Sequence, residues 1–285
     1  MTSRRAAHQH EPHDDDHQDF GDLHTDLRLT GASLQRRRLL QLAMGVGVLH
    51  LLGCGGDDPT GTTTDGNSSG NLSCTKIPEE TAGPYPGDGS NGPNVLALSG
   101  VVRSDLRTSF AGLSGTAGGV LLTTTLTIVE RSTCAPLAGR AVYLWHADRE
   151  GRYSLYSSGV TDQNYLRGVQ VTDANGQVTF VSVFPGCYAG RWPHIHFEIY
   201  PSLAVATASS NKVATSQLGF PKATCDLVYA TTGYAASITN LAGVSLATDN
   251  VFSDGSSQQI AAMSGDPDFE GEHVAPHVPA PDTMP

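Results

Sequence analysis

Short runs whose pattern of hydrophobic and polar residues is typical of β-strands recur along the chain from about residue 95. The most regular run is 194–200 (HIHFEIY), and five others separated by turn signals are 95–104, 119–130, 141–147, 169–173 and 177–184. A period of two residues predicts β-strands. Ala174-Asn175-Gly176 separates the last two of these five runs, and Asn-Gly supplies the positive φ of a hairpin turn.

No segment keeps the 3.6-residue apolar period of a long amphipathic helix, although residues 220–232 and 256–263 could each form a short one. We therefore predict an all-β fold: a β-sandwich core with short helices and long loops, spanning residues 74–264 as one domain. Composition agrees, because 32 glycines, 16 prolines and only 16% charged residues are unlike a coiled coil or a helical repeat array.

Four segments flank this domain. Residues 1–33 are polar and hold five of the 11 histidines, which predicts a disordered tail, with metal scavenging as an alternative. Residues 34–54 join an arginine-rich start to a 15-residue apolar run that is too short to span a bilayer. Residues 55–73 predict a flexible linker, and the Pro- and acid-rich residues 265–285 a second disordered tail.

The 34–54 segment resembles a twin-arginine signal that ends in a lipobox, in which Cys54 would be acylated. This resemblance implies export across the bacterial cytoplasmic membrane and lipid anchoring at the cell envelope. A cytoplasmic protein with a fortuitous apolar segment is the alternative. The net charge of −11 argues against nucleic-acid binding and against attraction to anionic lipid headgroups, so an acyl anchor would be the membrane attachment.

Four further cysteines lie within the predicted domain, and none belongs to a CxxC pair. An even number in an exported chain predicts two disulfides, and four cysteines allow three connectivities. These cysteines are Cys74, Cys134, Cys187 and Cys225.

His194 and His196 are the strongest candidates for chemistry. Residues i and i+2 of a strand project from the same face, so both imidazoles point one way and Ile195 points the other. Such a pair often supplies two of the ligands of a metal site, but it also occurs on exposed strands that have no function. His146, the third histidine of the domain, precedes a turn and is interpreted as structural.

Several motifs surround this histidine pair in a fixed order. They are W-x₅-G-x-Y at 145–153, LRG-x-Q-x-T-D at 166–173, PG-x-Y at 185–188 and R-x-x-HIHF at 191–197. This set resembles the intradiol ring-cleavage dioxygenases, non-haem ferric enzymes with a β-sandwich fold that open catechols between the two hydroxylated carbons. The resemblance runs from about Thr81 to Pro221.

The resemblance implies an Fe(III) ion held by Tyr153, Tyr188, His194 and His196. Phenolate is a hard anionic donor that favours Fe(III), and a bound cation makes tyrosine ionise below its usual pKa of about 10. The implied reaction cleaves a catecholic ring with O2 to a cis,cis-muconate-type product. Tyr156, three residues after Tyr153, could be mistaken for it, and only the G-x-Y motif favours Tyr153.

The resemblance also implies roles beyond the metal. Arg191 matches an arginine that stabilises charge on the substrate, and Gln217 matches a glutamine lining the same pocket. Thr81 and Tyr85, within TAGPY, match a segment that contacts substrate near the cavity mouth. Each could instead be structural, as we expect for two further motif residues, Arg167 and Asp173.

Two other functions stay open. A β-sandwich without catalytic activity could bind catecholic ligands in the same pocket, and a zinc hydrolase could use His194 and His196. The gap from Tyr188 to His194 is shorter than in the soluble family members that act on aromatic acids, so the substituents on the catechol are not predicted. The oligomeric state is not predicted either, because the chain lacks the helical N-terminal region through which catechol-type members dimerise.

Overall fold

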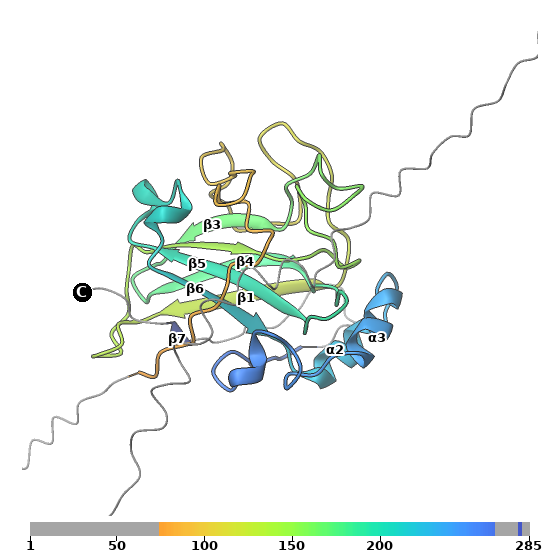
Figure 1. The fold of residues 1–285 in the computed structure, drawn as a ribbon. Helices are drawn as coiled ribbons and strands as arrows, with labels where there is room; N and C mark the ends of the chain where they lie inside the picture. The colour runs from red at the N-terminus through yellow and green to blue at the C-terminus, as the bar shows by residue number, and fades with distance from the viewer. Residues whose placement is uncertain (1–73, 266–278, 281–285) are drawn as a thin grey trace, which may run out of the picture. The chain divides into compact units, whose positions relative to one another are not determined.

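The computed structural model describes residues 74–265 and the backbone of Pro279–Ala280 (Figure 1). The expected polar tail, export signal, Cys54 and linker, together with most of the expected C-terminal tail, lie outside the described residues. Inside that C-terminal segment, Pro279–Ala280 forms a short strand, β7, which pairs with Thr127 and Ile128. No helix within the described part of the chain is long and apolar enough to cross a membrane.

Two sheets make up the predicted β-sandwich, as Figure 1 shows. One has the order β4-β1-β7, where β1 pairs antiparallel with β4 and parallel with β7. The other has the order β3-β2-β5-β6 and is antiparallel throughout. The strand bounds are β1 Leu121–Ile128, β2 Ala141–Trp145, β3 Arg167–Val171, β4 Gln177–Val183, β5 His194–Tyr200 and β6 Ala214–Gly219.

The main core lies between the two sheets. Leu122 and Phe180 of the β4-β1-β7 sheet pack in one cluster with Ile195 and Phe197 of β5. The helices α2 (Lys222–Tyr229) and α3 (Ala235–Ala242) join the same cluster through buried side chains. Short 3₁₀ turns complete the described structure at Leu203–Val205, Ser209–Asn211 and Phe252–Asp254.

The β3-β2-β5-β6 sheet is buried on its other face as well. Tyr143 and Trp145 of β2 and Tyr200 of β5 pack there with Val101 and Tyr153 from the loops. Every residue of β5 is therefore buried, including its polar ones. Polar side chains on this face are enclosed by loops, which gives them the dry surroundings that an active site needs.

Two expectations about secondary structure were wrong, and two elements were missed. Residues 95–104 form turns and a single bridge, because Leu98 donates to Val95 and Gly100 has a φ of +91°. Residues 256–263 form no helix, since Ile260 runs parallel to the end of β6 at Gly219. The strand β6 and the helix α3 were missed, because neither has a clear apolar period in the sequence.

One disulfide is present among the described cysteines, between Cys74 and Cys134. The expectation of a second one is corrected by the structure, where Cys187 and Cys225 are free and buried. The Cys187 thiol lies 3.4 Å from the carbonyl oxygen of Arg191, so it contacts backbone instead of a second sulfur. Burial raises the pKa of the Cys187 thiol to about 12, which keeps it protonated and unreactive.

Candidate active site

The two histidines of β5 lie on the buried face of the four-stranded sheet that is covered by loops. His194 is 3% exposed and His196 2%, while Ile195 between them faces the core. The backbone register places His196 opposite Trp145 of β2, and the two rings stack at 4.9 Å with an angle of 6°. The strand and this stacking partner fix the orientation of the His196 ring.

Two tyrosines bring their hydroxyl groups to the same point. The Tyr153 oxygen lies 3.3 Å from Nε2 of His194 and 3.2 Å from Nε2 of His196. The Tyr188 oxygen lies 3.3 Å from Nε2 of His194, and the two Nε2 atoms are 3.0 Å apart. Four side chains that are up to 43 residues apart in sequence thus converge on one small volume.

These spacings fit a set of ligands around one cation. Two donors that each lie about 2.1 Å from a metal and at right angles are about 3.0 Å apart. The Nδ1 atom of His194 lies 2.5 Å from the carbonyl oxygen of Trp192, which can only accept a hydrogen bond. Nδ1 therefore carries the proton, and the lone pair of Nε2 points towards the shared volume.

Burial controls the charge of all four groups. It lowers the pKa of His194 and of His196 well below the usual range, so both imidazoles are neutral, as metal ligands must be. Burial raises the pKa of Tyr153 well above its usual value. It also raises the pKa of Tyr188, although the positive charge of Arg191 acts to lower that pKa. A bound cation is therefore what would ionise these phenols.

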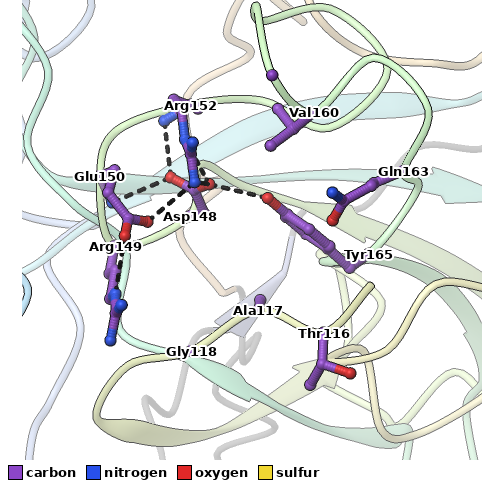
Figure 2. Close-up of a pocket in the computed structure, with 11 residues that line it drawn as sticks. Thr116, Ala117, Gly118, Asp148, Arg149, Glu150, Arg152, Val160, Gln163 and Tyr165 are labelled. Carbon is purple, nitrogen blue, oxygen red and sulfur yellow. Dashed lines mark hydrogen bonds and ion pairs between the residues drawn. The ribbon is translucent and has the colours of Figure 1, made fainter. Parts of the chain in front are cut away.

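The turn between β2 and Tyr153 is organised by Asp148, which is 1% exposed. Its carboxylate accepts hydrogen bonds from the backbone N–H groups of Glu150 and Arg152, from Nε of Arg152 and from the Tyr165 hydroxyl, and Figure 2 shows these groups around it. Gly151 completes the turn with a φ of +81°, and a Cβ there would lie 3.1 Å from Cβ of Tyr188. The glycine of the G-x-Y motif thus lets the two tyrosine segments pack together.

Residues of this turn also line a polar cavity of about 290 Å³ (Figure 2). It is lined by 11 residues, including Arg149, Arg152 and Gln163, and none of the predicted site residues is among them. It is therefore separate from the point where the histidines and tyrosines converge.

The Tyr188 segment is held from the other side by α3, an element that the sequence analysis missed. The backbone N–H of Cys187 donates to Ser237 Oγ at 2.9 Å, and Asn240 Nδ2 donates to the Cys187 carbonyl at 2.7 Å. Both partners belong to α3. The helix therefore fixes the backbone immediately before the Tyr188 side chain.

Arg191, Gln217 and Thr81 form one hydrogen-bonded chain. Nη2 of Arg191 donates to Oε1 of Gln217 at 2.6 Å, and Nε2 of Gln217 donates to the Thr81 carbonyl at 2.8 Å. Gln217 lies on β6, directly opposite His196 in the sheet. The structure thus brings together three residues for which the sequence analysis predicted roles beside the metal.

Asp249 completes this chain and was missed, because no motif in the sequence marks it. It is fully buried and accepts hydrogen bonds from Nε of Arg191 at 3.0 Å and from the backbone N–H of Trp192 at 2.7 Å. Burial alone would lower the pKa of Arg191, but its electrostatic interactions with Tyr188 and Asp249 outweigh the burial and raise the pKa. Arg191 therefore stays positively charged beside the tyrosines.

The TAGPY segment also lies against the site. The Tyr85 ring packs on the Tyr153 ring at 5.0 Å and on the Tyr156 ring at 5.3 Å. Tyr156 itself turns away, since its hydroxyl accepts from the Gly87 N–H and donates to Asn91. The structure therefore places Tyr153, not Tyr156, beside the two histidines.

The remaining candidates serve local structure. His146 is buried and its Nδ1 bonds the Ala147 carbonyl at 2.8 Å, and Asp173 accepts the Asn175 and Gln177 N–H groups within the hairpin turn. Within the described part of the chain, no group of three His, Cys, Asp or Glu side chains could hold a metal. The zinc alternative therefore lacks its further ligand among these residues.

Comparison with known proteins gives three findings. A family model described as "Dioxygenase" matches residues 91–237. The structure of an intradiol ring-cleavage dioxygenase from Tetranychus urticae is 26% identical with a TM-score of 0.56, and the match covers 73% of this chain and 95% of that one. Chlorocatechol 1,2-dioxygenase from Rhodococcus opacus is 33% identical over 60 residues, which are 21% of this chain and 23% of that enzyme.

The residues matched by the family model are more than half of the chain. They include the four converging side chains, Tyr153, Tyr188, His194 and His196, as well as Arg191 and Gln217. The two-sheet fold agrees with the structural match to the intradiol ring-cleavage dioxygenase from Tetranychus urticae. The chain is therefore a member of the intradiol ring-cleavage dioxygenase family.

Proposed function

We propose that this protein is a ferric intradiol dioxygenase that cleaves a catecholic ring with O2 and releases a cis,cis-muconate-type product. The observation that carries the proposal is the convergence of two phenol oxygens and two imidazole nitrogens, 3.0 to 3.3 Å apart, in a buried site. A module that only bound catechols would have no need for four such donors around one point.

Tyr153, Tyr188, His194 and His196 would hold the iron. Ferric iron, when bound, would accept both catechol oxygens and make the ring reactive towards O2. The protein contributes a dry environment, because three of these four side chains are less than 4% exposed. The hydrogen bond from His194 Nδ1 to the Trp192 carbonyl keeps the proton away from the ligating nitrogen.

Arg191 would stabilise negative charge that develops on the substrate. Its guanidinium is fixed by Asp249 on one side and by Gln217 on the other, so it needs no rearrangement during the reaction. Gln217 in turn holds the Thr81 carbonyl, which fixes the start of the segment that carries Tyr85. Tyr85 would form one wall of the ring-binding cavity.

The proposed reaction needs no external reductant. One catechol and one O2 give one diacid, with both oxygen atoms of O2 in the product and one ring C–C bond broken. The test is therefore to incubate the iron-loaded protein with catechol under ¹⁸O₂ and to measure oxygen uptake and product mass. We expect one O2 consumed per catechol and two ¹⁸O atoms per product.

Tyr153→Phe should abolish this turnover, while Tyr156→Phe should retain it, because the Tyr156 hydroxyl bonds Gly87 and Asn91 instead of facing the histidines. A wild-type protein that binds catechol without consuming O2 would favour the binding module. Uptake of only one ¹⁸O atom would contradict intradiol chemistry.

We also propose that the protein is exported and attached to the cell envelope through an acyl chain on Cys54. The disulfide between Cys74 and Cys134 supports this, since disulfides persist in oxidising compartments. Labelled palmitate should enter the wild-type protein and not a Cys54→Ser variant. Equal labelling of both proteins would refute the anchor.

A further inference from the structure

Arg167, from the LRG motif, is a buried charge held by uncharged hydrogen-bond acceptors. It is 1% exposed, and the five hydrogen bonds that its guanidinium donates within the described structure all go to neutral groups. Burying a charge is costly unless hydrogen bonds satisfy it. Its position therefore depends on the neutral groups that surround the guanidinium.

Those groups come from three separate parts of the chain. Nε donates to Ser154 Oγ at 3.0 Å and Nη2 to the Ser154 carbonyl at 2.9 Å, directly after Tyr153. Nη2 also donates to the Tyr85 carbonyl at 3.0 Å. Nη1 donates to the Pro86 carbonyl at 2.8 Å and to the Tyr143 hydroxyl at 3.3 Å. One side chain thus ties the Tyr85 segment to the Tyr153 segment and to β2.

The Tyr85–Pro86 backbone has little freedom beside this guanidinium. Tyr143 donates a second hydrogen bond to the Pro86 carbonyl at 2.7 Å. A Cβ on Gly87 would lie 2.8 Å from Nη1 of Arg167, so the chain passes as close to the guanidinium as a glycine allows. The segment is therefore held at one end by Gln217, through the Thr81 carbonyl, and at the other end by Arg167.

The Tyr85 ring lies between these two attachments. It packs 5.0 Å from the Tyr153 ring, whose hydroxyl is among the four converging donors. A shift of the Tyr85 backbone would move the ring relative to the site, while the donors themselves would stay on β5 and on the two tyrosine segments.

We propose that Arg167 is a positioning residue that fixes Tyr85 beside Tyr153 and thereby determines which substituents on a catechol ring are accepted. This rests on the proposed function, since it names a determinant of specificity for the same site. Arg167 acts through Tyr85 and touches neither the substrate nor the converging donors.

Lysine in place of Arg167 keeps the charge but lacks the planar fork that reaches the carbonyls of Tyr85, Pro86 and Ser154 together. The principal variant is therefore Arg167→Lys. The matched control is Arg140→Lys, at the opposite end of β2, where the arginine also donates to a backbone carbonyl, that of Pro201. Tyr143→Phe is a second, milder variant, because it removes one of the two donors to Pro86 and leaves Arg167 in place.

The experiment measures kcat/KM for catechol and for 4-tert-butylcatechol in the iron-loaded proteins, together with their visible spectra. We expect Arg167→Lys to keep the visible band, to raise KM more than it lowers kcat, and to change the ratio of the two kcat/KM values by about tenfold. Tyr143→Phe should change this ratio in the same direction by less, and Arg140→Lys should leave it unchanged. An unchanged ratio in Arg167→Lys, or a lost visible band, would overturn the proposal.

Hydrogen exchange of residues 83–91 tests the same contact without iron. Arg167→Lys should speed exchange in this segment and Arg140→Lys should not. If Arg167→Lys does not fold, Tyr143→Phe is compared with the wild type instead. Equal hydrogen exchange of residues 83–91 in these two proteins would then overturn the proposal. A wild-type protein that takes up no iron would refute the proposed function, whereas equal exchange in Arg167→Lys and wild type would refute the role of Arg167.

Discussion

The phenol oxygen of Tyr188 lies 3.3 Å from Nε2 of His194, six residues later in the chain. The backbone between them turns tightly, with the Arg191 N–H donating to the Tyr188 carbonyl at 3.3 Å. This short connection lets one loop and the start of one strand supply two donors, and it also carries Arg191 to the same place.

Replacing Tyr188 by phenylalanine removes one of the two phenol donors while keeping the ring that packs against Tyr153 and His194. We expect Tyr188→Phe to lose the visible band of the iron-loaded protein or to shift it strongly. Tyr156→Phe is the control, since its hydroxyl lies outside the site. An unchanged spectrum in Tyr188→Phe would remove this tyrosine from the set of ligands.

Arg191→Ala should keep iron and colour but lose turnover. The guanidinium is not among the four converging donors, and loss of one group that stabilises developing charge costs about 10² to 10³ in kcat. Iron content, the visible spectrum and kcat would be measured on the same sample. Arg191→Lys keeps the charge and should recover part of the activity, whereas full activity in Arg191→Ala would exclude this arginine from the mechanism.

The Cys74–Cys134 disulfide closes a long loop, with a sequence separation of 60. Constraining the unfolded chain over such a loop is expected to stabilise the protein by about 4 kcal/mol. Urea unfolding of the Cys74→Ser/Cys134→Ser double variant should show this loss, and dithiothreitol should destabilise the wild type but not the variant. Equal stability of the two proteins without reductant would contradict the prediction.

Acid should destabilise the metal-free protein through His146. Burial lowers the pKa of His146 to about 4, whereas the unfolded chain has the usual value of about 6.5. Protons therefore bind the unfolded state first, and stability present above pH 6.5 is lost as the pH falls towards 4. Between pH 7.5 and pH 5, this one group costs about 2 kcal/mol of the free energy of unfolding.

Between pH 7.5 and pH 5, the free energy of unfolding should fall by about 2 kcal/mol less in His146→Gln than in the wild type. Urea unfolding at both pH values measures this difference. Glu198 acts in the opposite direction, because burial raises its pKa to about 7, but it is present in both proteins and cancels in the comparison. Parallel pH dependences would mean that His146 does not stay neutral in the fold.

Local pattern was sufficient to predict the part of the fold that carries the histidines. Strict alternation identified His194–Tyr200 as a strand with both imidazoles on one face, and the structure has β5 over these same residues. The resemblance to the intradiol dioxygenases then implied that Tyr153 and Tyr188 join them. The strand and each single motif are patterns of residues that are close in sequence.

Contacts between distant segments could not be predicted in this way. Asp249 meets Arg191 across 58 residues, and its own surroundings carry no regular apolar pattern. The 95–104 run was expected to be a strand, yet it forms turns that pack against the outer face of the β3-β2-β5-β6 sheet and joins the sheet only through the bridge from Val102 to Val169 of β3. Free Cys187 and Cys225 show likewise that an even cysteine count does not determine pairing.

The central claim is that Tyr153, Tyr188, His194 and His196 hold ferric iron. The most direct test is the visible absorption spectrum of the purified mature domain with iron analysis, before and after anaerobic addition of catechol. The account predicts one iron per chain and a broad tyrosinate-to-Fe(III) band that shifts when catechol binds. A colourless protein that takes up no ferric iron would contradict it.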